Sequence, residues 1–115
     1  MLRVDTRPRR RNSSRAAETR SYPAHLQWLR GRPCAVERSG NCGGRMEAAH
    51  VDHAGGKGVG LKVADSKAVP LCAEHHAEYH RGARTFQATH GIDLVAAAAR
   101  YAAASPHRHL WEVRA

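Results

Sequence analysis

The stretch Leu71-Cys72-Ala73-Glu74-His75-His76-Ala77-Glu78-Tyr79-His80 holds the densest group of potential metal ligands in the chain. A helix turns by about 100° per residue, so a helix here places Cys72 and His75 about 60° apart. His76 and His80 fall about 40° apart on a different side of the same helix. The segment therefore offers two ligand pairs on different faces, which favours two metal ions over one.

The first pair, Cys72 and His75, supplies half of a tetrahedral zinc site, and Cys34 and Cys42 are the remaining thiols. Their separation is wider than the roughly two to four residues usual between zinc cysteines, and the alternative is that both are small core residues. The chain has three cysteines, an odd number that argues against a closed disulfide framework. We therefore predict a structural zinc held by Cys34, Cys42, Cys72 and His75.

The second pair, His76 and His80, is unremarkable by itself, since histidine is common on exposed helix surfaces. Upstream, however, lies His50-Val51-Asp52-His53. Asp52 offers a hard oxygen ligand for magnesium or manganese, and His53 is a base that takes a proton from an attacking water. We predict a catalytic metal bound by Asp52, His76 and His80. His50 stays open as a further ligand, an orienting residue or a core histidine.

The pattern of the remaining sequence predicts an α+β domain in which a long loop and two short strands pack on the metal-bearing helix. Helices are expected over 21–29 (Ser21 as cap), 72–81 (ended by Gly82) and 92–104, with strands over 46–53 and 63–71. One Phe, two Trp and three Tyr provide little large apolar volume. A small domain of this composition needs a further source of stability, and a bound metal is a common one.

The formal net charge of +9 and a pI near 10.5 indicate a polyanionic partner. Residues 1–20 contain seven arginines and are expected to form a flexible basic arm, which either grips DNA phosphates or solubilises the chain. Residues 21–115 then form the folded domain. Lys57, Lys62 and Lys67 are expected to contact the DNA backbone, the alternative being a solvated basic face.

The chain has no apolar run of the roughly 20 residues that a membrane span needs, and its first residues lack the apolar stretch of a secretory signal. We therefore expect a cytoplasmic protein with no membrane partner. Clustered cysteines and histidines in a reducing cytosol more often bind metal than form disulfides.

The order of these motifs resembles the HNH (ββα-metal) nuclease superfamily. The series Cys42-Gly43-Gly44, Ala49-His50-Val51-Asp52-His53, a glycine-rich loop, and Val69-Pro70-Leu71-Cys72 followed by His75-His76 looks more narrowly like the phage recombination-enhancement (Ref-type) nucleases. The resemblance implies a ββα-metal fold and an endonuclease that leaves 3′-hydroxyl and 5′-phosphate ends on DNA. It implies His53 as general base, His76 as the ligand closing the motif, and Asp52 and His80 as supporting ligands. It also implies a RecA filament as a partner in phage recombination.

The chain departs from the family pattern at one position. The central Asn of the motif would fall near Lys67, and no Asn follows Asn41. Either Asp65 or Ser66 substitutes for it, or activity is reduced. This departure keeps open a zinc-stabilised DNA-binding module without catalysis. A structural zinc protein with no nucleic-acid role and a ribonuclease are further alternatives. The sequence leaves the native catalytic metal and the oligomeric state open.

Overall fold

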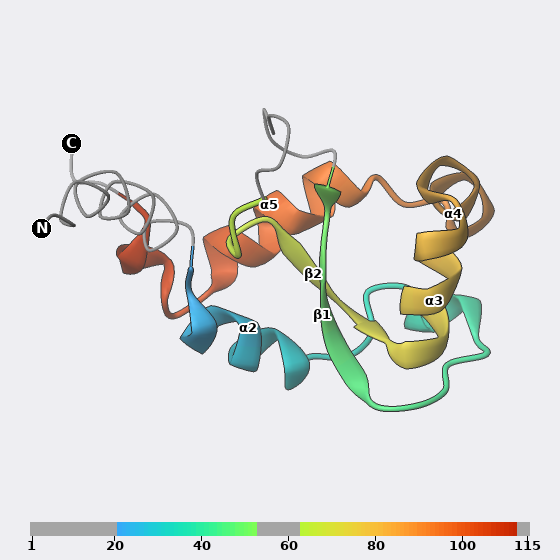
Figure 1. Cartoon of the computed structure of the whole chain (residues 1–115), viewed down its shortest axis with the longest axis horizontal. Coiled ribbons are helices and arrows are strands. Elements are labelled where there is room, and N and C mark those ends of the chain that lie inside the picture. Colours follow the sequence, from blue (N-terminus) through green and yellow to red (C-terminus); the bar gives the residue numbers. More distant parts are fainter. Residues whose placement is uncertain (1–20, 53–62, 113–115) are drawn as a thin grey trace, which may run out of the picture.

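The computed structural model describes residues 21–52 and 63–112 (Figure 1). The elements run in the order α2 (Pro23–Arg30), η1 (Glu37–Ser39), β1 (Met46–His50), β2 (Ala68–Cys72), α3 (Ala73–Arg81), α4 (Ala83–His90), α5 (Leu94–Ala104) and η3 (Arg108–Leu110). The predicted α+β class is confirmed, because the two strands form a hairpin that leads directly into a helix, with further helices around them. In the described ranges no helix combines the length and apolar character needed to cross a bilayer.

The two strands pair antiparallel from Met46 opposite Cys72 to His50 opposite Ala68. The prediction that the first strand continues to residue 53 was too long. Pairing ends with one extra hydrogen bond, from the amide of Val51 to the carbonyl of Lys67 (2.9 Å), and Asp52 leaves the extended conformation. The second strand begins later than predicted because residues 65–67 form a turn, closed by the Lys67 amide donating to the carbonyl of Ala64.

Helix α3 starts at the end of β2, and Cys72 is its N-cap. The Cys72 sulfur accepts the amide hydrogen of His75 at 3.4 Å. The two preceding amides donate to a loop: Ala73 to the carbonyl of Arg45 (2.9 Å) and Glu74 to the carbonyl of Gly43 (3.1 Å). Amides in the first turn of a helix have no partner within the helix, so this loop supplies the acceptors that the α3 terminus needs.

Three details of the helices differ from the sequence-based expectation. Ser21 does not cap the first helix: Tyr22 is the N-cap and makes no side-chain cap, while Pro23 lies in the first turn as expected. Gly82 does end α3, but a further helix, α4, begins at Ala83 and was not predicted. The last helix begins at Leu94, because the side chain of Asp93 accepts the amide of Ala96 and caps it there.

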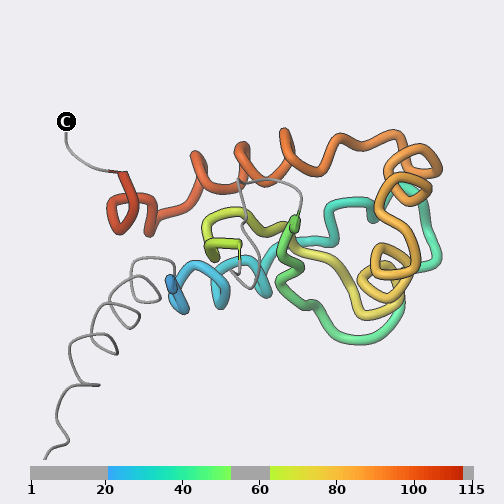
Figure 2. Tube along the Cα trace, turned by 45° about the horizontal axis from the view of Figure 1, so that its top comes forward, coloured from blue at the N-terminus to red at the C-terminus, as the bar shows by residue number. Residues whose placement is uncertain are grey.

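The hairpin lies between helices that are distant in sequence. Helices α2 and α5 both contact the strands, and α3 and α4 stack at the opposite end of the hairpin from the start of α2 and from η3 (Figures 1 and 2). The shared core is small and joins the strands to α3, α4 and α5 through Leu71, Tyr79, Phe86 and Leu94, each at most 5% exposed. Because α3 is anchored on this core, its remaining faces are held in fixed orientations.

Candidate metal centre and the neighbouring histidines

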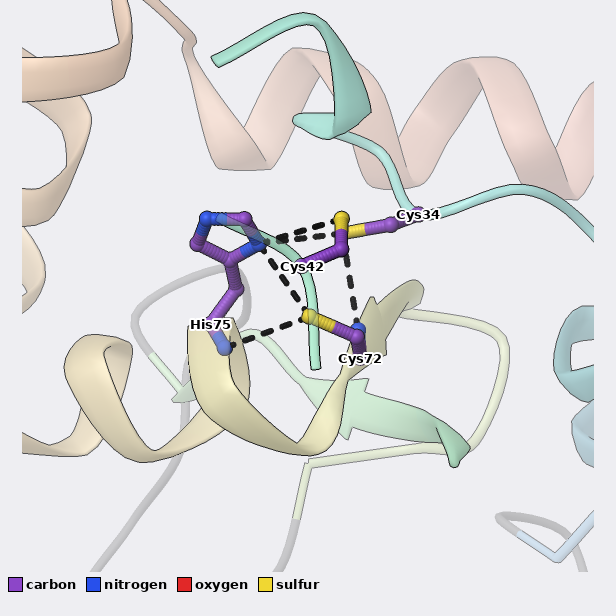
Figure 3. Close-up of side chains that lie close together, drawn as sticks. All are labelled: Cys34, Cys42, Cys72 and His75. Atoms are coloured by element: carbon purple, nitrogen blue, oxygen red, sulfur yellow. Dashed lines mark hydrogen bonds between the residues drawn. The ribbon is translucent and has the colours of Figure 1, made fainter. Parts of the chain in front are cut away.

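The four predicted zinc ligands lie together. Figure 3 shows Cys34 and Cys42 reaching from the loop before β1 towards Cys72, at the junction of β2 and α3, and His75 on α3. The Nδ1 atom of His75 lies 3.2 Å from the sulfur of Cys72, 3.5 Å from that of Cys34 and 3.7 Å from that of Cys42. All four donor atoms lie within 4.8 Å of one another.

These separations suit a tetrahedral zinc ion. Zinc binds sulfur at about 2.3 Å and nitrogen at about 2.0 Å, so a tetrahedral arrangement separates the two donors by about 3.5 Å. The three measured separations fall on either side of that value. Cys34 and Cys72 are buried, whereas Cys42 is exposed, so the alternative that Cys34 and Cys42 are both core residues does not fit Cys42. The donors are therefore consistent with a structural zinc ion.

The thiols of this cluster influence one another's charge. Desolvation and the neighbouring thiols of Cys72 and Cys34 raise the pKa of Cys42 to about 12. Desolvation also acts on Cys72, but the amides of His75 and Gly43, 3.4 and 3.5 Å from its sulfur, lower the pKa of Cys72. Negative charge is thus favoured on one sulfur and opposed on another. A divalent cation would remove this conflict by binding several thiolates together.

His90 lies beside His75 and contacts two further polar side chains. The Nε2 atom of His90 lies 3.0 Å from a carboxylate oxygen of Glu78, and its Nδ1 lies 2.6 Å from the hydroxyl of Ser39. The rings of His75 and His90 are 5.1 Å apart and almost perpendicular. His75, Glu78 and His90 are also a second group whose donor atoms lie within 4.8 Å of one another. A hollow of about 500 Å³ opens beside them.

On another side of α3, His76 and His80 lie outside the cysteine–histidine cluster. Their rings lie 4.7 Å apart, and His80 is exposed. The Nδ1 atom of His76 lies 2.6 Å from a carboxylate oxygen of Glu47 on β1. The third predicted ligand of the catalytic metal, Asp52, is exposed, and its amide donates to the hydroxyl of Tyr79 (3.3 Å). Within the described ranges, Asp52, His76 and His80 do not bring three donor atoms within 4.8 Å.

The end of β1 carries a second histidine–carboxylate pair. The Nε2 atom of His50 lies 2.7 Å from Oδ1 of Asp65, and the other carboxylate oxygen of Asp65 accepts the amide of Tyr22 at 2.8 Å. Asp65 was one of two residues expected to replace the missing Asn, and it does contact a histidine of the motif. The partner is His50, whose role the sequence left open.

Several predicted residues lie outside the described part of the chain. They are the general base His53, the DNA-contacting Lys57 and Lys62, and the basic arm over residues 1–20. Lys67 is described and exposed. Glu47 and His90 were not predicted as site residues. Their partners come from elements 29 and 51 residues away in sequence, so no local pattern marks them.

The fold and its cysteine–histidine cluster define a small α+β protein with a candidate zinc centre at the junction of a β-hairpin and the following helix. The chain belongs to the family described as "Protein of unknown function (DUF968)", whose model matches residues 2–105. No curated protein and no solved structure matches the chain.

Proposed function

We propose that the chain is a zinc-stabilised, metal-dependent endonuclease of the HNH (ββα-metal) kind that hydrolyses DNA phosphodiester bonds. One observation carries the proposal: α3 holds His75 of the cysteine–histidine cluster and separately presents His76 and His80, directly after an antiparallel hairpin. The net charge of +9 supports a nucleic-acid substrate. The structural zinc then has the task of fixing the helix that bears the catalytic histidines.

The donor set around His76 fits a transition metal better than magnesium. Magnesium prefers oxygen ligands, whereas imidazole suits zinc, nickel and related ions, and manganese tolerates a mixture of oxygen and nitrogen. His76 and His80 are the residues that would hold the ion, with a carboxylate nearby. Such an ion would act as a Lewis acid that stabilises charge on the phosphate and on the leaving oxygen.

The protein's own part in the reaction is to remove a proton from water. An imidazole accepts that proton while the water oxygen bonds to phosphorus, and the bond between phosphorus and the 3′ oxygen breaks. The 3′ oxygen takes up a proton, which leaves a 3′-hydroxyl and a 5′-phosphate. The resemblance assigns the imidazole to His53. His50 is the alternative, and the contact that favours it is its hydrogen bond to Asp65, since a base works best when a neighbouring group orients it.

A plasmid-nicking assay with manganese, magnesium or zinc tests the proposal. We expect cleavage by the wild type, loss of cleavage in His76→Ala, and loss in whichever of His50→Ala and His53→Ala removes the base. DNA binding and zinc content should be unchanged in the inactive base variant. His109→Ala, an exposed change in η3, is the matched control.

The alternative function is a zinc-stabilised DNA-binding module without catalysis, which the absent Asn favours. It predicts salt-dependent DNA binding and no cleavage with any divalent metal. Addition of a RecA filament on single-stranded DNA to the same assay tests the further proposal that RecA presents the substrate. In that case cleavage should appear, or rise, only on the DNA that carries the filament. A matched RNA substrate tests the ribonuclease alternative.

A further inference from the structure

The contact between Glu47 and His76 joins strand β1 to the face of α3 that lies outside the zinc cluster. One carboxylate oxygen of Glu47 lies 2.6 Å from Nδ1 of His76. From this contact we infer that Glu47 is a positioning residue: it fixes His76 so that Nε2 is the nitrogen presented to a divalent cation. This inference rests on the proposed function and names the carboxylate that serves its metal site.

The hydrogen bond determines which nitrogen is free. An ionised carboxylate only accepts hydrogen bonds, so Nδ1 of His76 must donate. A neutral imidazole has one N–H group, and Nε2 is therefore left with its lone pair. Histidines that bind metals commonly donate their other nitrogen to a carboxylate in this way, which fixes the ring and raises its basicity.

The hairpin register places Glu47 where its carboxylate can accept the hydrogen bond from His76. Glu47 pairs with Leu71, one residue before the N-cap of α3, and so lies beside the first turn of that helix. Side chains alternate along a strand, so Ala49 lies on the same face as Glu47. Ala49 is fully buried, so this face of β1 lies towards the core. Glu47 is the acidic residue on that face, and its carboxylate reaches His76 on α3.

The pair formed by His76 and Glu47 lies at the protein surface. The side chain of His76 is 21% exposed and that of Glu47 is 37% exposed, so the pair is accessible from solvent. The exposed ring of His80 lies alongside His76, 4.7 Å from it and tilted by 31°. Two adjacent imidazoles, one of them hydrogen-bonded to a carboxylate, can supply two of the donor atoms that a manganese or zinc site needs.

Two measurements on the full-length, zinc-loaded protein test the inference. The first is the tautomer of His76, read from long-range proton–nitrogen NMR at mildly alkaline pH without added manganese. The wild type should show a protonated Nδ1 and a bare Nε2. The second is the affinity for manganese, measured by electron paramagnetic resonance. Glu47→Ala should weaken it by roughly 10- to 100-fold. Glu47→Gln, which keeps an acceptor oxygen but loses the charge, should lie between the two.

Glu112→Gln is the control, because Glu112 is a 56% exposed carboxylate that follows η3 and pairs with Arg108. It should behave as the wild type in both measurements. The inference is overturned if the wild-type His76 carries its proton on Nε2, or if Glu47→Ala and Glu47→Gln bind manganese as tightly as Glu112→Gln. If the tautomer and affinity results hold but no variant or wild type cleaves DNA, the nuclease proposal fails while the role of Glu47 stands.

Discussion

The hydroxyl of Ser39 and Nδ1 of His90 lie 2.6 Å apart, although 51 residues separate them in sequence. Ser39 belongs to the loop between Cys34 and Cys42, and His90 ends α4 and also contacts Glu78 on α3. His90 therefore ties the cysteine-bearing loop to α3, which begins after Cys72 and carries His75. This contact explains how a loop wider than the usual zinc spacing is held closed.

We expect His90→Ala to lower the free energy of unfolding by about 1–3 kcal/mol, because its side chain is only 7% exposed and its hydrogen bonds to Ser39 and Glu78 are lost. Zinc should also pass to a competing chelator faster than in the wild type. Chemical denaturation and chelator kinetics measure the two effects. His109→Ala is the control. Identical zinc release by the two variants would show that the Ser39 contact does not hold the loop.

Replacement of Cys42 by Ser distinguishes a metal ligand from a packing residue. Cys42 is exposed, so its packing contributes little, and only the loss of a ligand gives a large effect. We expect the variant to lose its zinc and its cooperative unfolding transition, since a structural zinc contributes on the order of 10 kcal/mol to a small domain. Metal analysis and circular dichroism provide the measurements.

Asn41→Gly is the matched control for Cys42→Ser. Asn41 adjoins Cys42 and has a positive φ of 63°, which glycine adopts without strain, so zinc should be retained. A full equivalent of zinc in Cys42→Ser would refute the four-ligand site.

Gly40 lies within the loop from Cys34 to Cys42, and Gly44 lies just after it. Replacing each by alanine compares the cost of backbone strain with the cost of close packing. Gly40 and Gly44 both have φ of +79°, but a Cβ at Gly44 would lie 2.6 Å from the Cβ of Ala73, whereas one at Gly40 meets nothing within 4 Å. Gly40 combines this φ with a ψ of −177°, a backbone region that is essentially restricted to glycine, so Gly40→Ala should cost about 1–3 kcal/mol. Gly44→Ala should cost a further ~1–3 kcal/mol from overpacking at the start of α3. Equal losses in thermal denaturation would contradict this.

Stability should fall on mild acidification because of His25. Its Nδ1 contacts Ser105 (3.0 Å), and its Nε2 has no hydrogen-bond partner among the described residues. Burial lowers the pKa of His25 below 6.5, His107 adds to this and Asp65 opposes it. The unfolded chain therefore binds the proton more readily. The stability that neutral, buried His25 contributes is complete above pH 6.5, the pKa in the unfolded chain. It is lost as the pH falls through the lower pKa of His25 in the folded protein.

Tryptophan fluorescence measures this effect directly. The two tryptophans of the chain, Trp28 and Trp111, lie 5.7 and 4.8 Å from the His25 ring, centroid to centroid. We expect a flatter dependence of stability on pH in His25→Gln than in the wild type or in His109→Gln. The same slope in all three proteins would mean that His25 is not the group responsible.

Lys67 tests the DNA interface. It is exposed in the turn before β2, and a lysine that contacts a phosphate releases about one counterion. Lys67→Ala should weaken DNA binding on all sequences alike and reduce the salt slope by about 1, while Lys67→Arg should keep both. Titrations at several salt concentrations measure this. An unchanged slope in Lys67→Ala would place Lys67 away from the DNA.

The sequence was most informative where residues that act together are also close together in it. The spacing of Cys72, His75, His76 and His80 defined two faces of α3 because helix geometry is regular. Two strands were expected on either side of the glycine-rich sequence, and both form, although each is shorter than predicted. Gly82 was correctly identified as the end of α3.

Other features depend on contacts between distant segments and could not be derived from spacing. Helix α4 is only 8 residues long and has a single buried side chain, Phe86, so its apolar pattern is too short to mark a helix by itself. The pairings of Glu47 with His76 and of His50 with Asp65 depend on the hairpin register and on where the turn at 65–67 begins. A shift by one residue in either strand would exchange the faces on which these side chains lie.

Cys72 is at once the last residue of β2, the N-cap of α3 and a donor of the cysteine–histidine cluster, and its amide lies 3.4 Å from the sulfur of Cys34, 38 residues earlier. Binding of a metal ion by these donors would therefore hold the end of β2, the start of α3 and the Cys34 loop together in one step. A newly made chain should remain open to proteases until it is metallated. The cellular supply of zinc would then set how much of the protein survives, in addition to how active it is.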